Sequence, residues 1–176
     1  WSGGEMMFDN VRLVHEAYPD KHLFFTEGCA DSYKRDKLQD WTLGERYGYS
    51  MIHDFNNGTV GWTDWNILLD ETGGPNHVGN FCFAPVHADT KSGEVTYVSS
   101  YYYIGHFSKF IRPGAKRIAS SPSRSSLIST AFLNPDGKIL VVVMNKSEKK
   151  VEYLLWLAGN AAEVTCAPRS IQTLVI

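Results

Sequence analysis

The sequence predicts two structural classes in one chain, an α/β part followed by an all-β part. In residues 1–111, segments with helical spacing of apolar residues alternate with short apolar runs, a pattern that implies parallel strands joined by helices. Residues 112–176 hold only short strand-like runs, and the turn sequence Asn134-Pro135-Asp136-Gly137 separates two of them. We therefore expect an antiparallel β-sandwich in the second part.

The α/β part is predicted to begin with a helix over residues 5–18, where apolar residues recur at nearly helical spacing. The short apolar run from His22 to Thr26 indicates a buried strand, which ends at Glu27-Gly28. A second helix is expected over residues 39–56, and Asn56-Asn57-Gly58 supplies its C-terminal stop.

The next elements are shorter. A second strand is expected from Thr59 to Leu69, followed by a loop over residues 70–80 that is rich in Gly, Pro and Asn. Short strands are expected at residues 81–86 and 95–98, and Ser99 or Ser100 could cap a helix that runs to residue 110. In the all-β part, strands are expected at residues 116–119, 127–133, 139–145, 150–156, 163–166 and 172–176.

Composition excludes several classes of protein. The formal net charge of −2 provides no basic field for nucleic acid or anionic lipid, and no apolar run approaches the ~20 residues of a membrane span. Cys29, Cys82 and Cys166 have no C-x-x-C spacing, and we interpret all three as small buried hydrophobic residues. Aromatic residues make up 13% of the chain, which fits either a β-rich core or platforms for sugar rings.

The α/β part contains only two predicted parallel strands. Two such strands can neither close a barrel nor bury both faces of a sheet. The chain also starts at Trp1 without an initiator Met, and its first residues do not resemble a signal peptide. We therefore expect the chain to be a fragment, or to need a partner piece.

Candidate catalytic residues lie at the ends of the predicted strands. In β/α barrels, catalytic groups occupy the C-terminal ends of strands, and Glu27 has this position. Asp64, Trp62 and Trp65 lie in the next predicted strand. A carboxylate beside aromatic rings suits glycoside hydrolysis, in which a carboxylate attacks the anomeric carbon. From position alone, Glu27 could equally be a solvated acid at a strand end.

Four stretches of the sequence carry a family pattern, and they are Leu23-Phe24-Phe25-Thr26-Glu27-Gly28-Cys29, Val60-Gly61-Trp62-Thr63-Asp64-Trp65-Asn66, Gly73-Gly74-Pro75-Asn76-His77-Val78-Gly79-Asn80 and Gly105-His106-Phe107-Ser108-Lys109-Phe110-Ile111. In these stretches, and in their order and spacing, the chain resembles glycoside hydrolase family 30, the family of glucosylceramidases. The match continues at Asn134-Pro135-Asp136-Gly137 and at residues 141–145. Each stretch alone is a weak signal, but together they are highly specific.

The resemblance implies a (β/α)8 TIM barrel with an attached antiparallel β-sandwich, of which this chain supplies the end. Residues 1–111 would be the last two β/α units of the barrel and residues 112–176 the sandwich domain. Trp1 would lie near the end of strand six, Glu27 would end strand seven, and residues 62–66 would belong to strand eight. The family's sandwich also receives a contribution from the N-terminus of the chain, which precedes this sequence.

The resemblance also implies residue roles. Glu27 would be the nucleophile of a retaining β-glycosidase, whereas the acid/base Glu of the family precedes Trp1 and is not in this chain. Trp65 matches a Trp that lines the sugar pocket. Trp62, Asn80 and Phe81 are further substrate-binding candidates, with packing as the alternative role for Trp62 and a turn as the alternative for the other two.

The implied substrate is a β-linked glucoside, with glucosylceramide, simple β-glucosides, β-1,6-glucan and β-xylosides all within the family's range. Phe83 and His77 differ from the residues of glucosylceramidase itself, at positions where the leaving group would be contacted, and this argues against ceramide. No cofactor or metal is implied, and the family suggests a secreted, periplasmic or lysosomal compartment. The alternative of another class is a non-catalytic carbohydrate-binding or structural β-sandwich piece.

If residues 1–176 are expressed alone, we expect no glycosidase activity, together with aggregation or oligomerisation through unpaired barrel strands. Hydrolysis of an aryl β-glucoside and size-exclusion chromatography test this expectation. A monomeric, cooperatively folded and active product would contradict the interpretation as a fragment.

Overall fold

The computed structural model describes residues 5–176, and the chain forms two compact units. The first unit ends at Gly105 and the second begins at His106. The expectation that Trp1 lies near the end of barrel strand six falls outside the described residues. Among residues 5–176, no helix combines the length and apolar character that crossing a membrane requires.

The elements that begin in the first unit are α1 (Glu5–Ala17), β1 (Leu23–Gly28), β2 (Ala30–Asp31), the 3-10 helix η1 (Arg35–Lys37), α2 (Trp41–Asn56), β3 (Thr59–Asp64), β4 (Leu68–Asp70), β5 (Cys82–Phe83), β6 (Val86–Ala88), β7 (Val95–Tyr97) and α3 (Ser99–Ser108). This order confirms the predicted alternation of helices and strands.

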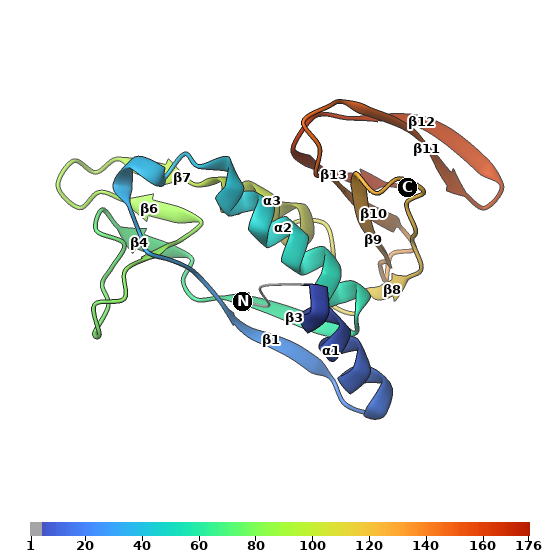
Figure 1. The fold of residues 1–176 in the computed structure, drawn as a ribbon, viewed down its shortest axis with the longest axis horizontal. Helices are drawn as coiled ribbons and strands as arrows, with labels where there is room; N and C mark the ends of the chain where they lie inside the picture. Colours follow the sequence, from blue (N-terminus) through green and yellow to red (C-terminus); the bar gives the residue numbers. More distant parts are fainter. Residues whose placement is uncertain (1–4) are drawn as a thin grey trace. The chain divides into compact units, whose positions relative to one another are not determined.

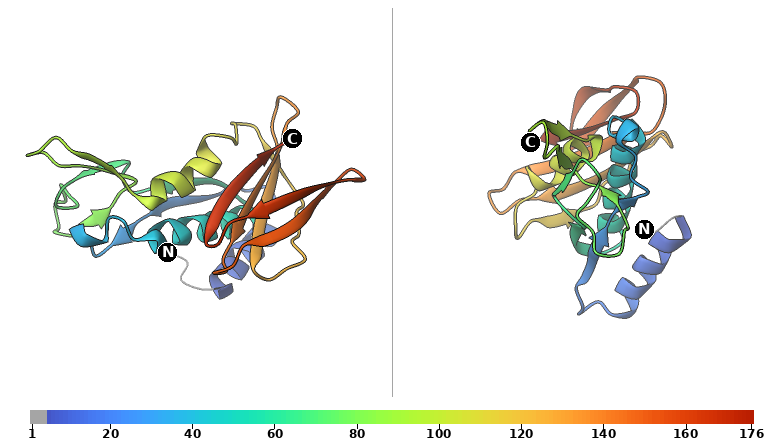
Figure 2. Two further views of the ribbon diagram at one scale, coloured as in Figure 1. Left: turned by 90° about the horizontal axis from the view of Figure 1, so that it is seen from above. Right: turned by 90° about the vertical axis from the view of Figure 1, so that its left-hand side faces the viewer.

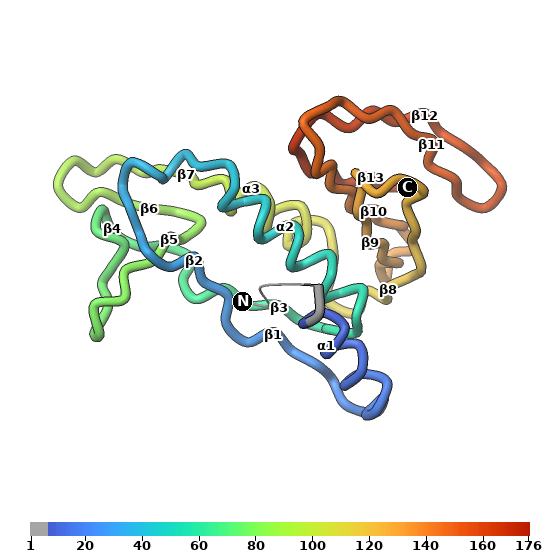
Figure 3. The backbone as a smooth tube through the Cα atoms, in the orientation of Figure 1, coloured from blue at the N-terminus to red at the C-terminus, as the bar shows by residue number. Residues whose placement is uncertain are grey.

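Strands β1 and β3 pair in parallel and are joined through α2, as in a β/α unit (Figure 1). Phe24 lies opposite Gly61, Phe25 opposite Trp62, and Gly28 opposite Asp64. The register shifts between Phe25 and Gly28, where β1 reaches its carboxyl end. After β1 the chain follows an extended course through β2 before it turns into η1 and α2 (Figure 3).

The single strand predicted from Thr59 to Leu69 is wrong, because the chain forms two strands there. Strand β3 pairs with β1 and ends at Asp64, whereas β4 pairs in parallel with β6, which in turn pairs antiparallel with β7. The segment that follows β1 also contains the short strand β2, which pairs with β5. The apolar residues of β4 continue the strand pattern of β3, so the sequence does not mark the change of partner.

Helix α2 supplies the core of the first unit. Its N-terminus is capped by the Asp40 carboxylate, which accepts a hydrogen bond from the Thr42 N–H at 3.0 Å. Tyr47 and Ile52 are fully buried, and the Tyr47 side chain contacts Trp62 and Asp64 of β3. Gly44 admits the start of α3, because a side chain there would collide with the Tyr103 ring.

The second unit contains β8 (Lys116–Ile118), β9 (Leu127–Leu133), β10 (Ile139–Asn145), β11 (Val151–Leu157), β12 (Asn160–Cys166) and β13 (Ser170–Val175). A four-stranded antiparallel sheet has the order β13-β10-β9-β8, and β11 and β12 form a hairpin. Figure 2 shows these strands in orange to red. Tyr153 and Leu155 of the hairpin pack against Val141 and Val143 of the sheet, which gives the predicted sandwich core.

The turn predicted in the second unit is confirmed. Residues 134–137 form the turn between β9 and β10, with Gly137 at a φ of 85°. The Asn134 side chain donates to the Phe110 carbonyl at 2.9 Å and accepts from the Arg112 N–H at 3.1 Å. His106 is a hydrogen-bonded structural residue, since its Nδ1 lies 3.1 Å from the Thr173 hydroxyl.

Asn145 at the end of β10 offers a test of how the sandwich is held together. Its buried amide donates to the carbonyls of Lys149 and Ala167, both at 2.8 Å, and accepts from the Ser147 N–H at 3.0 Å. Replacing Asn145 with Ala removes three part-buried hydrogen bonds and should lower the free energy of unfolding by about 3 kcal/mol, measured by urea denaturation. Asn160→Ala, at an exposed position in β12, should change it by less than ~0.5 kcal/mol. Equal effects of the two substitutions would contradict this account.

Candidate active site

Glu27 is the penultimate residue of β1, at the carboxyl end of the parallel pair, and its side chain is exposed. The following residue has to be glycine, because a Cβ on Gly28 would lie 2.5 Å from Cη2 of Trp62. The close approach of this ring fixes the backbone directly after Glu27. The Glu27 carboxylate therefore points to solvent from a strand end whose backbone packs against the Trp62 ring.

Trp62 of β3 provides that support. Its ring stacks on Phe25 with centroids 4.7 Å apart and an interplanar angle of 8°, and it meets Tyr47 edge-on at 5.6 Å. The indole N–H donates to Asp54 Oδ2 of α2 at 2.9 Å. The polar end of Trp62 is thus engaged inside the protein, which favours the packing role over direct contact with a sugar.

Two carboxylates behind the strand ends are held in partly buried surroundings. Burial raises the pKa of Asp64 to about 6, although the Tyr47 hydroxyl, which donates to Asp64 Oδ1 at 2.9 Å, opposes the shift. Burial likewise raises the pKa of Asp54 to about 6, opposed by the bond from Trp62. Asp64 lies opposite Gly28 in the register, so this carboxylate borders the backbone that carries Glu27.

Trp65 extends the contact between the two strands by one residue. Its backbone N–H donates to the Gly28 carbonyl at 2.6 Å, which places Trp65 beside the Glu27-Gly28 strand end. The Trp65 side chain remains 42% exposed, which leaves ring surface available for a ligand. Trp65 and Glu27 are therefore brought to one edge by a short backbone connection.

Asn80 and Phe81 lie in the loop between β4 and β5, next to the segment that follows Glu27. The Tyr33 N–H donates to the Phe81 carbonyl at 3.2 Å, and β2 pairs with β5 directly beyond this point. The Asn80 N–H is held by Asn76 Oδ1 at 3.1 Å, and both the Asn80 and Phe81 side chains are exposed. The loop thus lies alongside the segment that follows Glu27.

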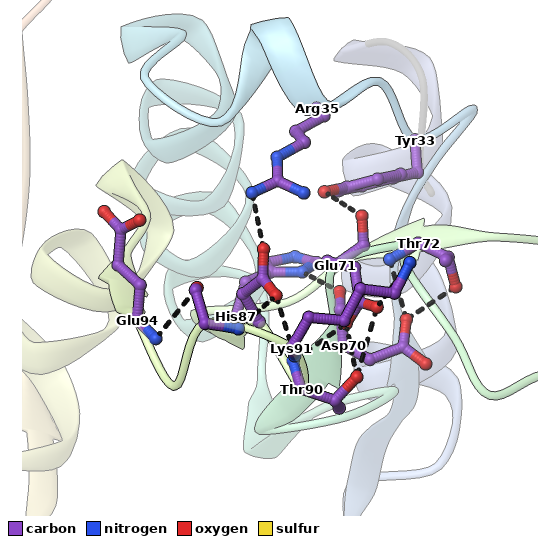
Figure 4. A network of polar contacts seen from close by, with 11 residues as sticks. Tyr33, Arg35, Asp70, Glu71, Thr72, His87, Thr90, Lys91 and Glu94 are labelled. Carbon is purple, nitrogen blue, oxygen red and sulfur yellow. Dashed lines mark hydrogen bonds and ion pairs between the residues drawn. The ribbon is translucent and has the colours of Figure 1, made fainter.

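A polar network that the sequence did not indicate braces this loop (Figure 4). Asp70 Oδ1 accepts from the Thr72 hydroxyl and from the N–H groups of Thr72 and Gly74, and these bonds, the hydroxyl's first, lower the pKa of Asp70. Thr90 donates to the Glu71 carboxylate, and Arg35 pairs with Asp89 at 2.6 Å. No single local pattern marks the network, because residues 70–74, residues 89–90 and Arg35 come from three segments of the chain.

The structure changes the interpretation of Phe83, one of two residues expected near the leaving group. Phe83 is buried, with its ring 5.1 Å from that of Tyr33, so it is not part of the exposed surface. His77 is exposed in the loop. In the described part of the chain, no three His, Cys, Asp or Glu side chains gather in an arrangement that could hold a metal ion.

The cysteines are all free thiols, with Cys82 and Cys166 buried as predicted. Cys29 is only partly buried and packs beside Leu69, Cys82 and Ala84. Burial raises the pKa of the Cys29 thiol, so Cys29 has little thiolate character although it lies two residues from Glu27.

The model of the glycosyl hydrolase family 30 TIM-barrel domain matches residues 7–111, and that of the family's beta sandwich domain matches residues 114–174. Lysosomal acid glucosylceramidase of Mus musculus is 38% identical over 142 residues, which cover 78% of this chain and 28% of that protein. Endo-1,6-beta-D-glucanase of Neurospora crassa is 30% identical over 146 residues, or 77% of this chain and 29% of that protein. The chain spans about a third of the length of the curated relatives it matches.

Solved structures agree with these matches. SrfJ from Salmonella typhimurium superimposes with a TM-score of 0.87 at 34% identity, covering 96% of this chain and 38% of that one. The endo-beta1,6-glucanase BT3312 gives a TM-score of 0.82 at 28% identity, covering 97% of this chain and 38% of that one.

The contact between Tyr47 and Asp64 can be tested by titration. Replacing Tyr47 with Phe removes the hydroxyl that opposes the effect of burial, so the pKa of Asp64 should rise above about 6. Carboxyl ¹³C chemical shifts followed against pH measure this change. Asp54 is the internal control and should keep its pKa of about 6, because its partner Trp62 is unchanged. An unchanged or lowered pKa of Asp64 would contradict the assignment.

Proposed function

Because this chain belongs to glycosyl hydrolase family 30, we propose that the protein carrying it is a retaining β-glycoside hydrolase in which Glu27 is the nucleophile. The observation that carries the proposal is the placement of an exposed carboxylate at the carboxyl end of β1, joined to Trp65 through the Gly28 carbonyl. Catalytic groups of β/α barrels occupy this edge.

In the proposed reaction, a Glu27 carboxylate oxygen attacks the anomeric carbon as the bond to the leaving oxygen breaks. A covalent glycosyl-enzyme forms, and water then displaces Glu27 with net retention of configuration. The leaving oxygen takes its proton from a second carboxylic acid about 5–5.5 Å from the nucleophile. We assign this acid/base to a Glu in the upstream part of the barrel, so both parts are needed for one active site.

The surrounding side chains suit a sugar ring. The exposed face of Trp65 offers an apolar platform for the C–H face of the sugar. Asn80 and Phe81 offer an amide and a second aromatic surface at the mouth of the site. Trp62 contributes indirectly, because its stacking on Phe25 and its packing on Gly28 support the strand end.

The proposed substrate is a β-linked glucoside. The names of the relatives suggest two candidate substrates, a glucosylceramide-type glycolipid and a β-1,6-glucan. Comparing hydrolysis of glucosylceramide in detergent micelles with hydrolysis of a β-1,6-linked glucan separates the two candidates.

We propose that the upstream half of the barrel is the partner that covers β1 and β3. Phe24 and Val60 are 57% and 59% exposed on this two-stranded sheet. Exposed apolar surface of this kind is typical of an interface with another part of a protein. We also propose that the barrel domain extends to residue 111, beyond the division of the two compact units at Gly105. In support, the last helix-type hydrogen bond runs from the Ile111 N–H to the Phe107 carbonyl, whereas the Arg112 N–H donates to Asn134 of the sandwich.

Glu27→Gln in the full-length protein should reduce kcat for an aryl β-glucoside on the order of 10³-fold or more, because the amide cannot form the covalent intermediate. In Glu27→Gly, added azide should restore turnover and yield the α-glycosyl azide, since the anion attacks from the face that Glu27 leaves vacant. Steady-state kinetics and NMR of the product measure both effects.

Glu94→Gln is the matched control. Glu94 lies between β6 and β7, and its exposed side chain should tolerate the change with less than ~2-fold effect on kcat. Turnover that survives Glu27→Gln largely intact would rule out the nucleophile assignment. It would favour the alternative of a carbohydrate-binding or structural piece.

A further inference from the structure

His87 of β6 is a buried imidazole that bridges the two ends of one loop. Its side chain is only 3% exposed. Nδ1 lies 2.8 Å from the carbonyl oxygen of Asp70, the last residue of β4, and Nε2 lies 3.0 Å from the N–H of Ala84, just after β5. The intervening residues 71–83 carry Asn80 and Phe81. One ring therefore closes the loop that holds two candidate substrate-binding residues.

The two bonds determine the protonation state of the ring. A carbonyl oxygen can only accept, so Nδ1 carries the hydrogen, and a backbone N–H can only donate, so Nε2 presents its lone pair. Only the neutral ring protonated on Nδ1 satisfies both partners. The imidazolium would point a second N–H at the Ala84 N–H, and that bond would be lost.

Tyr33 ties the same loop to the segment that follows Glu27. Its ring stacks on His87 with centroids 5.0 Å apart, its hydroxyl donates to the Glu71 carbonyl at 3.1 Å, and its N–H donates to the Phe81 carbonyl. Tyr33 thus contacts His87 through its ring and Phe81 through its backbone, so it links the two residues.

We propose that His87 is a positioning residue, whose neutral imidazole closes the loop of residues 71–83 and so holds Asn80 and Phe81 at the mouth of the Glu27 site. This inference rests on the proposed glycosidase function. His87 touches neither the sugar nor Glu27, so loss of the closure should weaken substrate binding and spare the chemical step.

The closure is sensitive to acid. Burial lowers the pKa of His87, opposed by the Asp70 carbonyl and by the negative charge of Asp70. Asp70 is the charged group that faces the ring from β4, and Tyr33 is the titratable group stacked on it. Two further neighbours of the ring are neutral. They are Phe83 of β5 and Thr96 of β7, which lies opposite His87 in the strand pairing. The closure is complete above the ordinary pKa of about 6.5 and is lost as the pH falls toward the lower pKa of the folded protein.

Kinetics of two variants of the full-length protein test the proposal. His87→Leu removes both hydrogen bonds and should raise KM for an aryl β-glucoside about 5-fold or more at pH 7, with kcat changed less than ~2-fold. His87→Gln supplies an amide oxygen that can accept from Ala84 without titrating. It should restore KM toward the wild-type value and abolish the rise of KM that we expect for the wild type between pH 7.5 and 4.5.

His22→Gln is the matched control, because His22 is exposed at the amino end of β1, away from the strand end that carries Glu27. Its KM should follow the wild-type pH profile. A KM in His87→Leu equal to that of the wild type, or the same acid dependence of KM in His87→Gln and wild type, would overturn the proposal.

A second measurement does not depend on activity. In ¹⁵N NMR spectra at pH 7, His87 should show the neutral tautomer protonated on Nδ1. Hydrogen exchange of residues 71–84, corrected for intrinsic rates, should lose protection in acid in the wild type but not in His87→Gln. The other tautomer or an imidazolium would overturn the closure itself, whereas an inactive wild type with these signatures would reject only the proposed glycosidase function.

Discussion

The packing of Trp62 on Gly28 is the contact on which the rest of the candidate site depends. Trp62 is fixed from three directions, by stacking on Phe25, by the edge of Tyr47 and by the bond to Asp54. A side chain at position 28 would displace this ring, or would push the end of β1 away from β3. Because Glu27 precedes this glycine and the Trp65 N–H binds its carbonyl, both side chains keep their places only while the close approach is preserved.

The ionisable groups around the site respond to acid in opposite directions. The pKa values of Asp64 and Asp54 are raised to about 6, so the folded protein binds these two protons more tightly than the unfolded chain does. The resulting contribution to stability is fully present below about pH 4 and declines as the pH rises through 6. His87 has a lowered pKa, and its contribution declines as the pH falls. Mild acid therefore increases the contribution of Asp54 and Asp64 to stability, whereas it weakens the hydrogen bonds by which His87 closes the neighbouring loop.

The sequence predicted most where local pattern and final pairing agree. The predicted strands 127–133 and 139–145 have their observed bounds, because the short strand-like runs and the turn at residues 134–137 give the same answer. The break after Asp64 was missed, because the apolar residues of β4 continue the pattern of β3 although they pair with β6. His87 was not recognised, since its partners lie at residues 33, 70 and 84 and no spacing links them. The motifs indicate Glu27 and Trp65 through resemblance, whereas the packing of Trp62 on Gly28 beside Glu27 depends on tertiary contacts.

The bridge made by Asn134 has a consequence for the order of events during synthesis. Phe110 and Arg112 leave the ribosome before Asn134, which lies 22 residues after Arg112 in the chain. Until the turn between β9 and β10 forms, the carbonyl of Phe110 and the N–H of Arg112 have only water to bind. The segment that follows α3 therefore acquires its direction late, from a hairpin that has not yet been translated when the segment first emerges.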